Sequence, residues 1–188
     1  MNLEKELKKI ENKKNTLEKK EIDLIIADFD DTIFCRKEQL DADENLLKFR
    51  GKEGNNYIKN VIGIEKFIKK FYINKNYPKT IPNKLRKNHD LILTAGMEEY
   101  SKAKLKATNI DMYNYKIVEK AEDKILETIK YVVNILGFIP NKITVFEDRP
   151  KIFVEYKKLI EEFFSTKLEI MFVEMSDNYN EPKITKID

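Results

Sequence analysis

A short apolar run that ends in a cluster of carboxylates constrains the fold of this 188-residue chain more than any other feature. Residues 22–27 read Ile-Asp-Leu-Ile-Ile-Ala, a nearly continuous apolar stretch that is typical of a buried strand in a parallel sheet. Asp28, Asp30 and Asp31 follow it at once. Buried carboxylates repel one another and must be paired or bound to a metal. The fold therefore has to bring positive charge to the end of this strand.

Further apolar runs, separated mostly by helical periodicities, predict the rest of the fold. One helical face runs from Ile125 to Leu136 and stops at Gly137, and another helix begins at Pro150. Strands that alternate with helices predict an α/β fold, a three-layer sandwich with a mainly parallel central sheet. The other expected strands lie at 91–93, 115–118, 143–146 and 168–173.

The chain divides into an arm, a body and an insert. We expect residues 1–21 to form an N-terminal helical arm and residues 22–188 to form one domain, in which 35–89 is a small basic insert or cap after the first strand. Apolar residues of the arm fall near heptad spacing, but Lys14 interrupts them. The arm is therefore expected to pack on the body of a monomer, and a weak dimer through the arm is the alternative.

Composition excludes several classes of protein. No apolar run approaches the roughly 18 residues of a membrane span. The charged N-terminus has no signal-peptide core, and a single cysteine, Cys35, cannot form an internal disulfide. These features argue against a membrane protein and a secreted disulfide scaffold, and they predict a cytoplasmic location.

Polar residues follow the expected strands, at the edge of a parallel sheet where ligands bind. Thr94, Ala95 and Gly96 follow the second strand, and Glu147 and Asp148 follow the fourth. A hydroxyl and a glycine before a helix can hold a phosphate, and clustered carboxylates favour Mg²⁺. Each motif alone also has a structural interpretation, such as a capped turn or an ion pair. Their shared placement at strand ends indicates a site.

The order of these motifs resembles that of phosphatases of the haloacid dehalogenase (HAD) superfamily. Residues 28–32, Asp-Phe-Asp-Asp-Thr, resemble the first motif, DxDxT, and Thr94 resembles the second. Lys124, or alternatively Lys120, resembles the third motif, and Glu147-Asp148 the acidic fourth. The match covers roughly residues 22–175 and corresponds to members with a small cap.

The resemblance implies a Mg²⁺-dependent phosphomonoester hydrolase. In it, Asp28 would be the nucleophile that becomes an aspartyl-phosphate, and Asp30 would act as acid and then as base. That double role requires Asp30 to have a higher pKa than Asp28. Asp28, the Asp30 main-chain carbonyl and Asp148 would hold Mg²⁺, with Glu147 sharing the metal contact or supporting it.

The resemblance also implies a phosphate-binding set, in which Thr94 and Lys124 hold the transferring oxygens. Ala95 and Lys120 are the further candidates for this set. The sequence Glu147-Asp148-Arg149 is weakly similar to the Asp-Asp-Arg of polynucleotide 3′-phosphatases and of RNA polymerase C-terminal-domain phosphatases.

A basic stretch points to the substrate. Residues 59–87 contain nine basic side chains and one acid, interleaved with Phe67, Phe71, Tyr72 and Tyr77. Such a stretch could bind phosphates and stack on bases, which makes nucleic-acid ends or nucleotides the leading substrate class. The other interpretation is a solvated lysine-rich face whose aromatic side chains lie in the core. A nucleic-acid-binding accessory protein with a vestigial HAD core is the alternative function.

Overall fold

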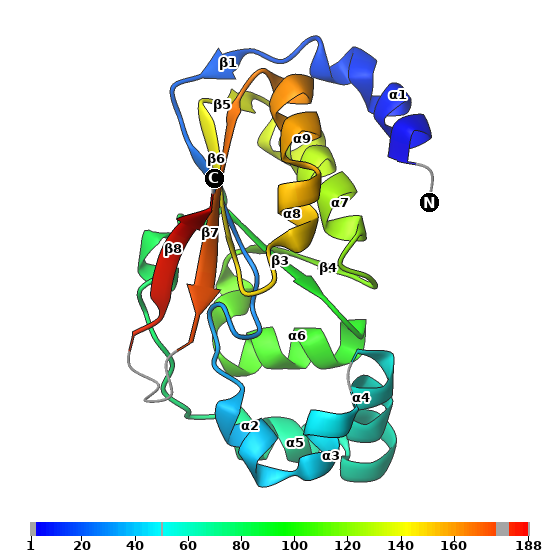
Figure 1. The fold of residues 1–188 in the computed structure, drawn as a ribbon, viewed down its shortest axis with the longest axis vertical. Helices are drawn as coiled ribbons and strands as arrows, with labels where there is room; N and C mark the ends of the chain where they lie inside the picture. Colours follow the sequence, from blue (N-terminus) through cyan, green and yellow to red (C-terminus); the bar gives the residue numbers. More distant parts are fainter. Residues whose placement is uncertain (1–2, 50, 176–180, 188) are drawn as a thin grey trace.

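The computed structural model describes residues 3–49, 51–175 and 181–187. Its centre is a sheet with the strand order β4-β3-β2-β6-β7-β8 (Figure 1). Neighbouring strands are parallel except for β7 and β8, which are antiparallel. The strands are β2 (Leu24–Ala27), β3 (Leu91–Ala95), β4 (Asn114–Val118), β6 (Lys142–Glu147), β7 (Lys167–Glu174) and β8 (Lys183–Ile187). The protein therefore has a mixed α/β fold with a mostly parallel sheet, as the sequence predicts.

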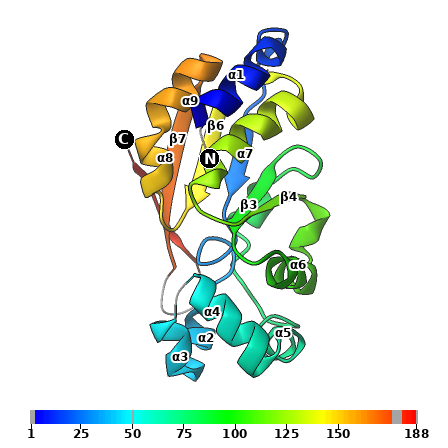
Figure 2. The same ribbon diagram turned by 90° about the vertical axis from the view of Figure 1, so that its right-hand side faces the viewer.

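Helices cover both faces of this sheet (Figures 1 and 2). One face packs against α7 (Asp123–Tyr131), its extension η4 (Val132–Leu136), α8 (Lys151–Glu155) and α9 (Lys157–Phe164). The other face packs against α6 (Glu98–Ala107) and the insert. Short elements complete this part of the chain: β1 (Lys19–Lys20) paired with β5 (Ile139–Pro140), and η3 (Ile110–Met112).

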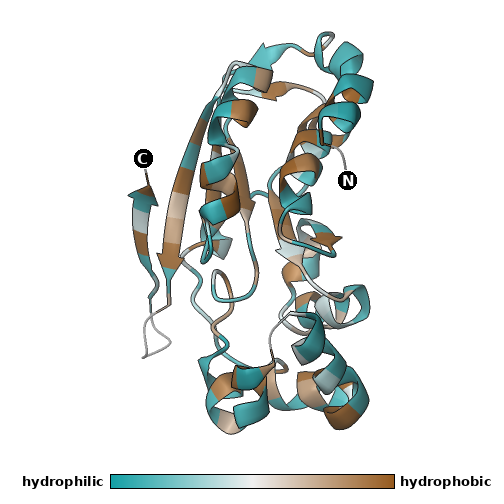
Figure 3. Cartoon of the chain, turned by 45° about the vertical axis from the view of Figure 1, so that its right-hand side comes forward, coloured by the Kyte–Doolittle hydropathy of each residue, from teal (hydrophilic) through white to brown (hydrophobic). Residues whose placement is uncertain are grey.

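Strand periodicity explains the two cores. Leu24 and Ile26 of β2 belong to the cluster that contains α7 and α9, whereas Ile25 and Ala27 face the cluster that contains α6. The helices alternate hydrophilic and hydrophobic residues along their length (Figure 3), as amphipathic helices on a sheet should. A strand buried on both faces reads as a continuous apolar run, which is the pattern at residues 22–27.

The insert consists of short helices that lie beyond the carboxyl ends of the strands, next to α6 (Figures 1 and 2). They are α2 (Lys37–Ala42), α3 (Glu44–Lys48), α4 (Lys52–Tyr57), η1 (Ile58–Ile62) and α5 (Ile64–Phe71). The chain then returns through η2 (Pro82–Lys84) toward the amino end of β3. Phe67, Phe71 and Tyr72 are buried in its core, and Tyr77 donates to the Thr108 carbonyl at 2.7 Å. Buried rings cannot stack on bases. The structure therefore agrees with the interpretation in which the aromatic side chains of this stretch lie in the core.

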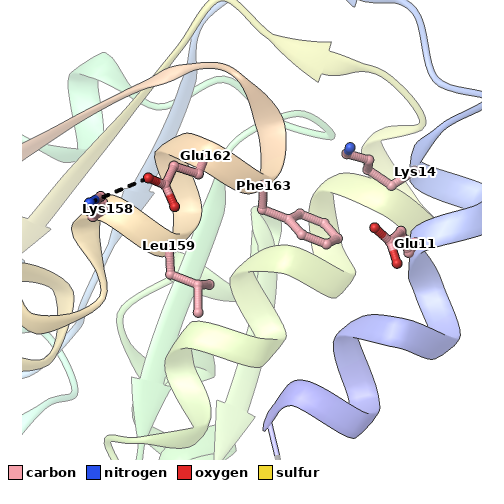
Figure 4. Close-up of a pocket in the computed structure, with 6 residues that line it drawn as sticks. All are labelled: Glu11, Lys14, Lys158, Leu159, Glu162 and Phe163. Carbon is pink, nitrogen blue, oxygen red and sulfur yellow. Dashed lines mark ion pairs between the residues drawn. The ribbon is translucent and has the colours of Figure 1, made fainter.

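The N-terminal arm contains α1 (Leu3–Lys14) and lies on the body. Leu3, Leu7, Ile10 and Leu17 pack against the cluster around α7 and α9, and Lys13 Nζ donates to Asn134 Oδ1 at 3.0 Å. An open groove separates α1 from α9, with Phe163 pointing toward α1 (Figure 4). The apolar residues at heptad-like spacing in the arm thus pack against the body of the same chain.

Two local features differ from the sequence-based expectation. The segment after Pro150 forms two helices, because the helix breaks at Tyr156, which has φ −102° and ψ 11°. The antiparallel strand β8 has no counterpart in the predicted set. Among the described helices, none combines the length and the apolar character that crossing a membrane requires.

A charge cluster on the β6-β7-β8 side of the sheet gives the fold an acid-sensitive element. Glu169 of β7 accepts from Lys186 of β8 at 2.8 Å and pairs with Lys167 at 3.0 Å and Lys142 of β6 at 3.3 Å. Hydrogen bonds from Lys186 and Lys167 are the main causes that lower the pKa of Glu169 from 4.5 to about 2. Folding therefore favours the ionised form of this side chain.

Glu169→Gln is expected to destabilise the protein at neutral pH and to have little effect near pH 2. The wild-type contribution is fully present above the unfolded pKa of 4.5 and is lost as the pH falls toward about 2. Urea unfolding of both proteins at pH 7 and at pH 2.5 measures the difference. A destabilisation that is equal at both pH values contradicts this account.

Candidate functional site

The candidate site lies where the connections of two neighbouring strands leave the sheet on opposite faces. β2 and β6 are neighbours, with Ala27 in register with Phe146. β2 leads into the insert on one face, and β6 leads into α8 on the other. Asp28 and Glu147 therefore emerge side by side. In open α/β sheets this is the position at which ligands bind.

Lys124 is the central cation of the site. It lies at the start of α7, and its Nζ is 2.6 Å from Glu147 Oε2 and 3.2 Å from Asp28 Oδ1. All three side chains are at least 95% buried. Burial by itself lowers the pKa of Lys124, but Asp28 and Glu147 outweigh it and raise that pKa. Lys124 therefore stays charged and holds the two carboxylates together.

Three carboxylates converge beside Lys124. Asp28, Glu147 and Asp148 each place an oxygen within 4.8 Å of the others. The Oδ1 atoms of Asp28 and Asp148 are buried, and neither accepts a hydrogen bond. Burial, followed by repulsion from Asp28, raises the pKa of Glu147 well above its usual value and raises that of Asp148. The protein alone leaves this cluster short of positive charge.

The charge balance fits a divalent cation. Three carboxylates form the acidic cluster, at Asp28, Glu147 and Asp148. Lys124 is the buried cation paired with two of them, whereas Arg149, which pairs with Asp148, is 74% exposed. With all three acids ionised, the excess of two negative charges over Lys124 and the all-oxygen donor set match Mg²⁺. Asp28, Asp148 and Glu147 are the residues that could hold it.

Asp30 is held by a second buried lysine. Lys104 of α6 is 2% exposed, and its Nζ is 2.5 Å from Asp30 Oδ2. Burial raises the pKa of Asp30, but Lys104 and Arg36 together outweigh burial, so the pKa is lowered. The resemblance implies that the pKa of Asp30 lies above that of Asp28. In the free protein, Asp30 is a carboxylate whose pKa is lowered by the neighbouring cations.

The loop that carries these aspartates is held by hydrogen bonds. Asp31 adopts a left-handed conformation with φ +56°, and its side chain accepts from the Arg36 main-chain N at 2.9 Å and from Arg36 Nε at 3.0 Å. The main-chain N atoms of Ile33 and Phe34 both donate to the Phe29 carbonyl. Asp31 therefore stabilises the loop, whereas Asp28 and Asp30 face the site.

The structure brings some predicted residues together and leaves others outside. Thr94 is 1% exposed at the end of β3, the strand next to β2, and Ala95 follows it half-buried. Lys124 pairs with Asp28, whereas Lys120 is exposed in the preceding turn. Of these two lysines, Lys124 is the one that the structure places beside Asp28.

Sequence reasoning missed Lys104 and Arg36. Lys104 is one of 32 lysines and lies on a helix without a clear motif. Of the lysines that the structure describes, only Lys104 and Lys124 are buried, and both pair with the motif aspartates. A usable signal was the spacing of Tyr100 and Lys104, which places them on one face of α6.

Comparison of the chain with protein-family models, with curated proteins and with solved structures finds no match. The resemblance to HAD phosphatases therefore rests on the motif residues of the sequence alone.

We predict that Asp148→Asn stabilises the metal-free protein and removes its response to Mg²⁺. The substitution deletes one charge from a crowded cluster, so the free energy of unfolding should rise by roughly 0.5–2 kcal/mol. In the wild type, Mg²⁺ at about 100 times its Kd should add about 2.7 kcal/mol. Thermal melts with EDTA or MgCl₂ measure both effects.

Glu162→Gln, which changes an exposed carboxylate on α9, is the matched control and should keep the Mg²⁺ response. An equal Mg²⁺ response in Asp148→Asn and in the wild type would remove Asp148 from the metal site.

Proposed function

We propose that this protein is a Mg²⁺-dependent phosphomonoester hydrolase of the HAD type. The observation that carries the proposal is the environment of Asp28. Its buried carboxylate is paired with Lys124 and lies next to Glu147 and Asp148, in a site that has two negative charges in excess over Lys124 when all three acids are ionised. A divalent cation would balance that excess, and an ionised, oriented carboxylate is what attack on phosphorus needs.

In the first step, Asp28 attacks the phosphorus atom of the substrate. An Asp28 oxygen–phosphorus bond forms, the bond from phosphorus to the leaving oxygen breaks, and the leaving oxygen takes up a proton. Asp28 Oδ1 accepts no hydrogen bond and lies 3.2 Å from Lys124 Nζ. In the second step, water attacks phosphorus, inorganic phosphate leaves and Asp28 is regenerated.

Asp30 is the proton-transfer residue in this proposal. As a carboxylate paired with Lys104, it can accept the proton of the attacking water in the second step. For the first step it must carry a proton. The charge of a bound phosphate would favour this, because a like charge nearby raises the pKa of a carboxylate.

Lys124 and Thr94 are proposed to bind the transferring phosphoryl group. Lys124 lies between two carboxylates, and its charge can offset the negative charge of the phosphate oxygens. Mg²⁺, held by Asp28, Asp148 and Glu147, would supply charge neutralisation and orientation.

Nucleotides and nucleic-acid ends are the substrate class we propose to test first. The four lysines of η1 and α5 are exposed on the insert, past the carboxyl ends of the strands (Figure 1), whereas Arg86 contacts the Asp23 carbonyl at the amino end of β2. A basic rim raises the rate at which anionic substrates arrive. Because Phe67, Phe71 and Tyr72 are buried, the proposal assigns recognition to charge and not to base stacking.

Asp28→Asn is expected to abolish phosphate release, by at least about 10³-fold, because the amide is a poor nucleophile. The assay measures inorganic phosphate released from an aryl phosphate, nucleoside monophosphates, sugar phosphates and oligonucleotides with 3′- or 5′-phosphates. EDTA should abolish the wild-type activity, and MgCl₂ should restore it.

Asp41→Asn, which alters an exposed carboxylate of the insert, serves as the control and should retain full activity. If wild type and Asp28→Asn release phosphate equally, the proposed nucleophile is wrong. If neither releases phosphate and both bind oligonucleotides with the same affinity, the nucleic-acid-binding alternative is favoured.

A further inference from the structure

Lys104 is a buried cation that the proposed chemistry has not used. Its side chain is 3% exposed and lies on α6, the helix that follows Thr94. Burying a lysine costs free energy unless a partner compensates for lost hydration. Its Nζ donates a hydrogen bond to Asp30 Oδ2 at 2.5 Å.

The pair leaves one oxygen of Asp30 free. Asp30 Oδ1 is buried and accepts no hydrogen bond, whereas Oδ2 is fixed by Lys104. Arg36 donates to Asp31 and adds charge near Asp30 without a hydrogen bond to it. Lys104 is therefore the one described side chain that fixes the direction of the Asp30 carboxylate by a hydrogen bond.

The ammonium of Lys104 is itself held in place. It lies 4.6 Å from the centroid of the Tyr100 ring and 5.5 Å from that of Phe29, within the range of cation–π attraction. The Tyr100 hydroxyl lies 3.2 Å from the Tyr72 hydroxyl, which donates to Gln39 Oε1 at 3.3 Å. Tyr72 and Gln39 of the insert thus help to hold α6 in position, and α6 carries Lys104.

We infer that Lys104 is a positioning residue for Asp30, an inference that rests on the proposed phosphatase function. Lys104 fixes Oδ2 so that the free Oδ1 is the atom that exchanges protons with water or the leaving oxygen. The arrangement parallels that of Asp28, which is held by Lys124. Each motif aspartate that the proposal uses for chemistry has its own buried lysine.

A double-mutant cycle tests this role with 4-nitrophenyl phosphate and MgCl₂. Lys104→Met should lower kcat about 10- to 100-fold, as loss of a supporting residue does, with KM changed less than about threefold. Lys104→Arg keeps the charge and should recover most of the lost kcat. In the Asp30→Asn background, Lys104→Met should cause no further loss, because Lys104 acts through Asp30.

The design separates positioning from a purely structural role. Lys104→Met leaves Asp30 as an unpaired buried charge and can destabilise the fold, whereas Asp30→Asn with Lys104→Met buries no charge. Lys102→Met, which removes an exposed lysine paired with Glu98 on the same helix, is the control and should keep wild-type kcat and KM. Circular dichroism and thermal melts confirm folding of each variant.

Each outcome decides the inference. A further loss of kcat on adding Lys104→Met to Asp30→Asn overturns it, because Lys104 then acts independently of Asp30. A rise in KM with unchanged kcat also overturns it and assigns Lys104 to substrate binding. Full wild-type activity of Lys104→Met overturns it while leaving the phosphatase proposal intact. A wild-type protein inactive on the whole substrate panel removes both proposals, which distinguishes that failure from the others.

Discussion

The burial of carboxylates at the ends of β2 and β6 is the constraint on which the rest of the structure depends. The register that pairs Ala27 with Phe146 brings Asp28 and Glu147 together, and neither is more than 4% exposed. Such a pair cannot persist in a dry interior without a cation. Lys124 supplies it, and α7 must begin where it does for Lys124 to reach both carboxylates.

The same requirement explains why the insert and α6 are coupled to the site. Asp30 needs a counter-charge, and Lys104 of α6 provides it. α6 is then anchored to the insert through the Tyr100 and Tyr72 hydroxyls. The insert, which the sequence presents as an addition to the sheet, thus supports the Lys104–Asp30 pair of the candidate site.

The sequence predicts the strands and the position of the site because the patterns that indicate them lie within short segments of the chain. The apolar runs give the parallel strands, and the carboxylates after β2 and β6 give the site, since parallel strands end at one edge. The partners of those carboxylates are not local. Lys104 is 74 residues from Asp30 in the chain, and only its spacing from Tyr100 on α6 distinguishes it from other lysines. The strand β8 pairs antiparallel at the edge of the sheet and alternates weakly, so its pattern does not stand out.

The charges of the acidic cluster also connect the stability of the protein with the metal site that we propose. The acidic cluster of Asp28, Glu147 and Asp148 contains one buried cation, Lys124, so we expect the cluster to lower the stability of the metal-free protein. Two of those acids, Glu147 and Asp148, have raised pKa values because burial and Asp28 both oppose their charge. A cluster with only a structural purpose would gain from replacing one acid with an amide. An acidic cluster that lowers stability is what the divalent-cation site that we propose would require, because proteins give up stability mainly at functional sites.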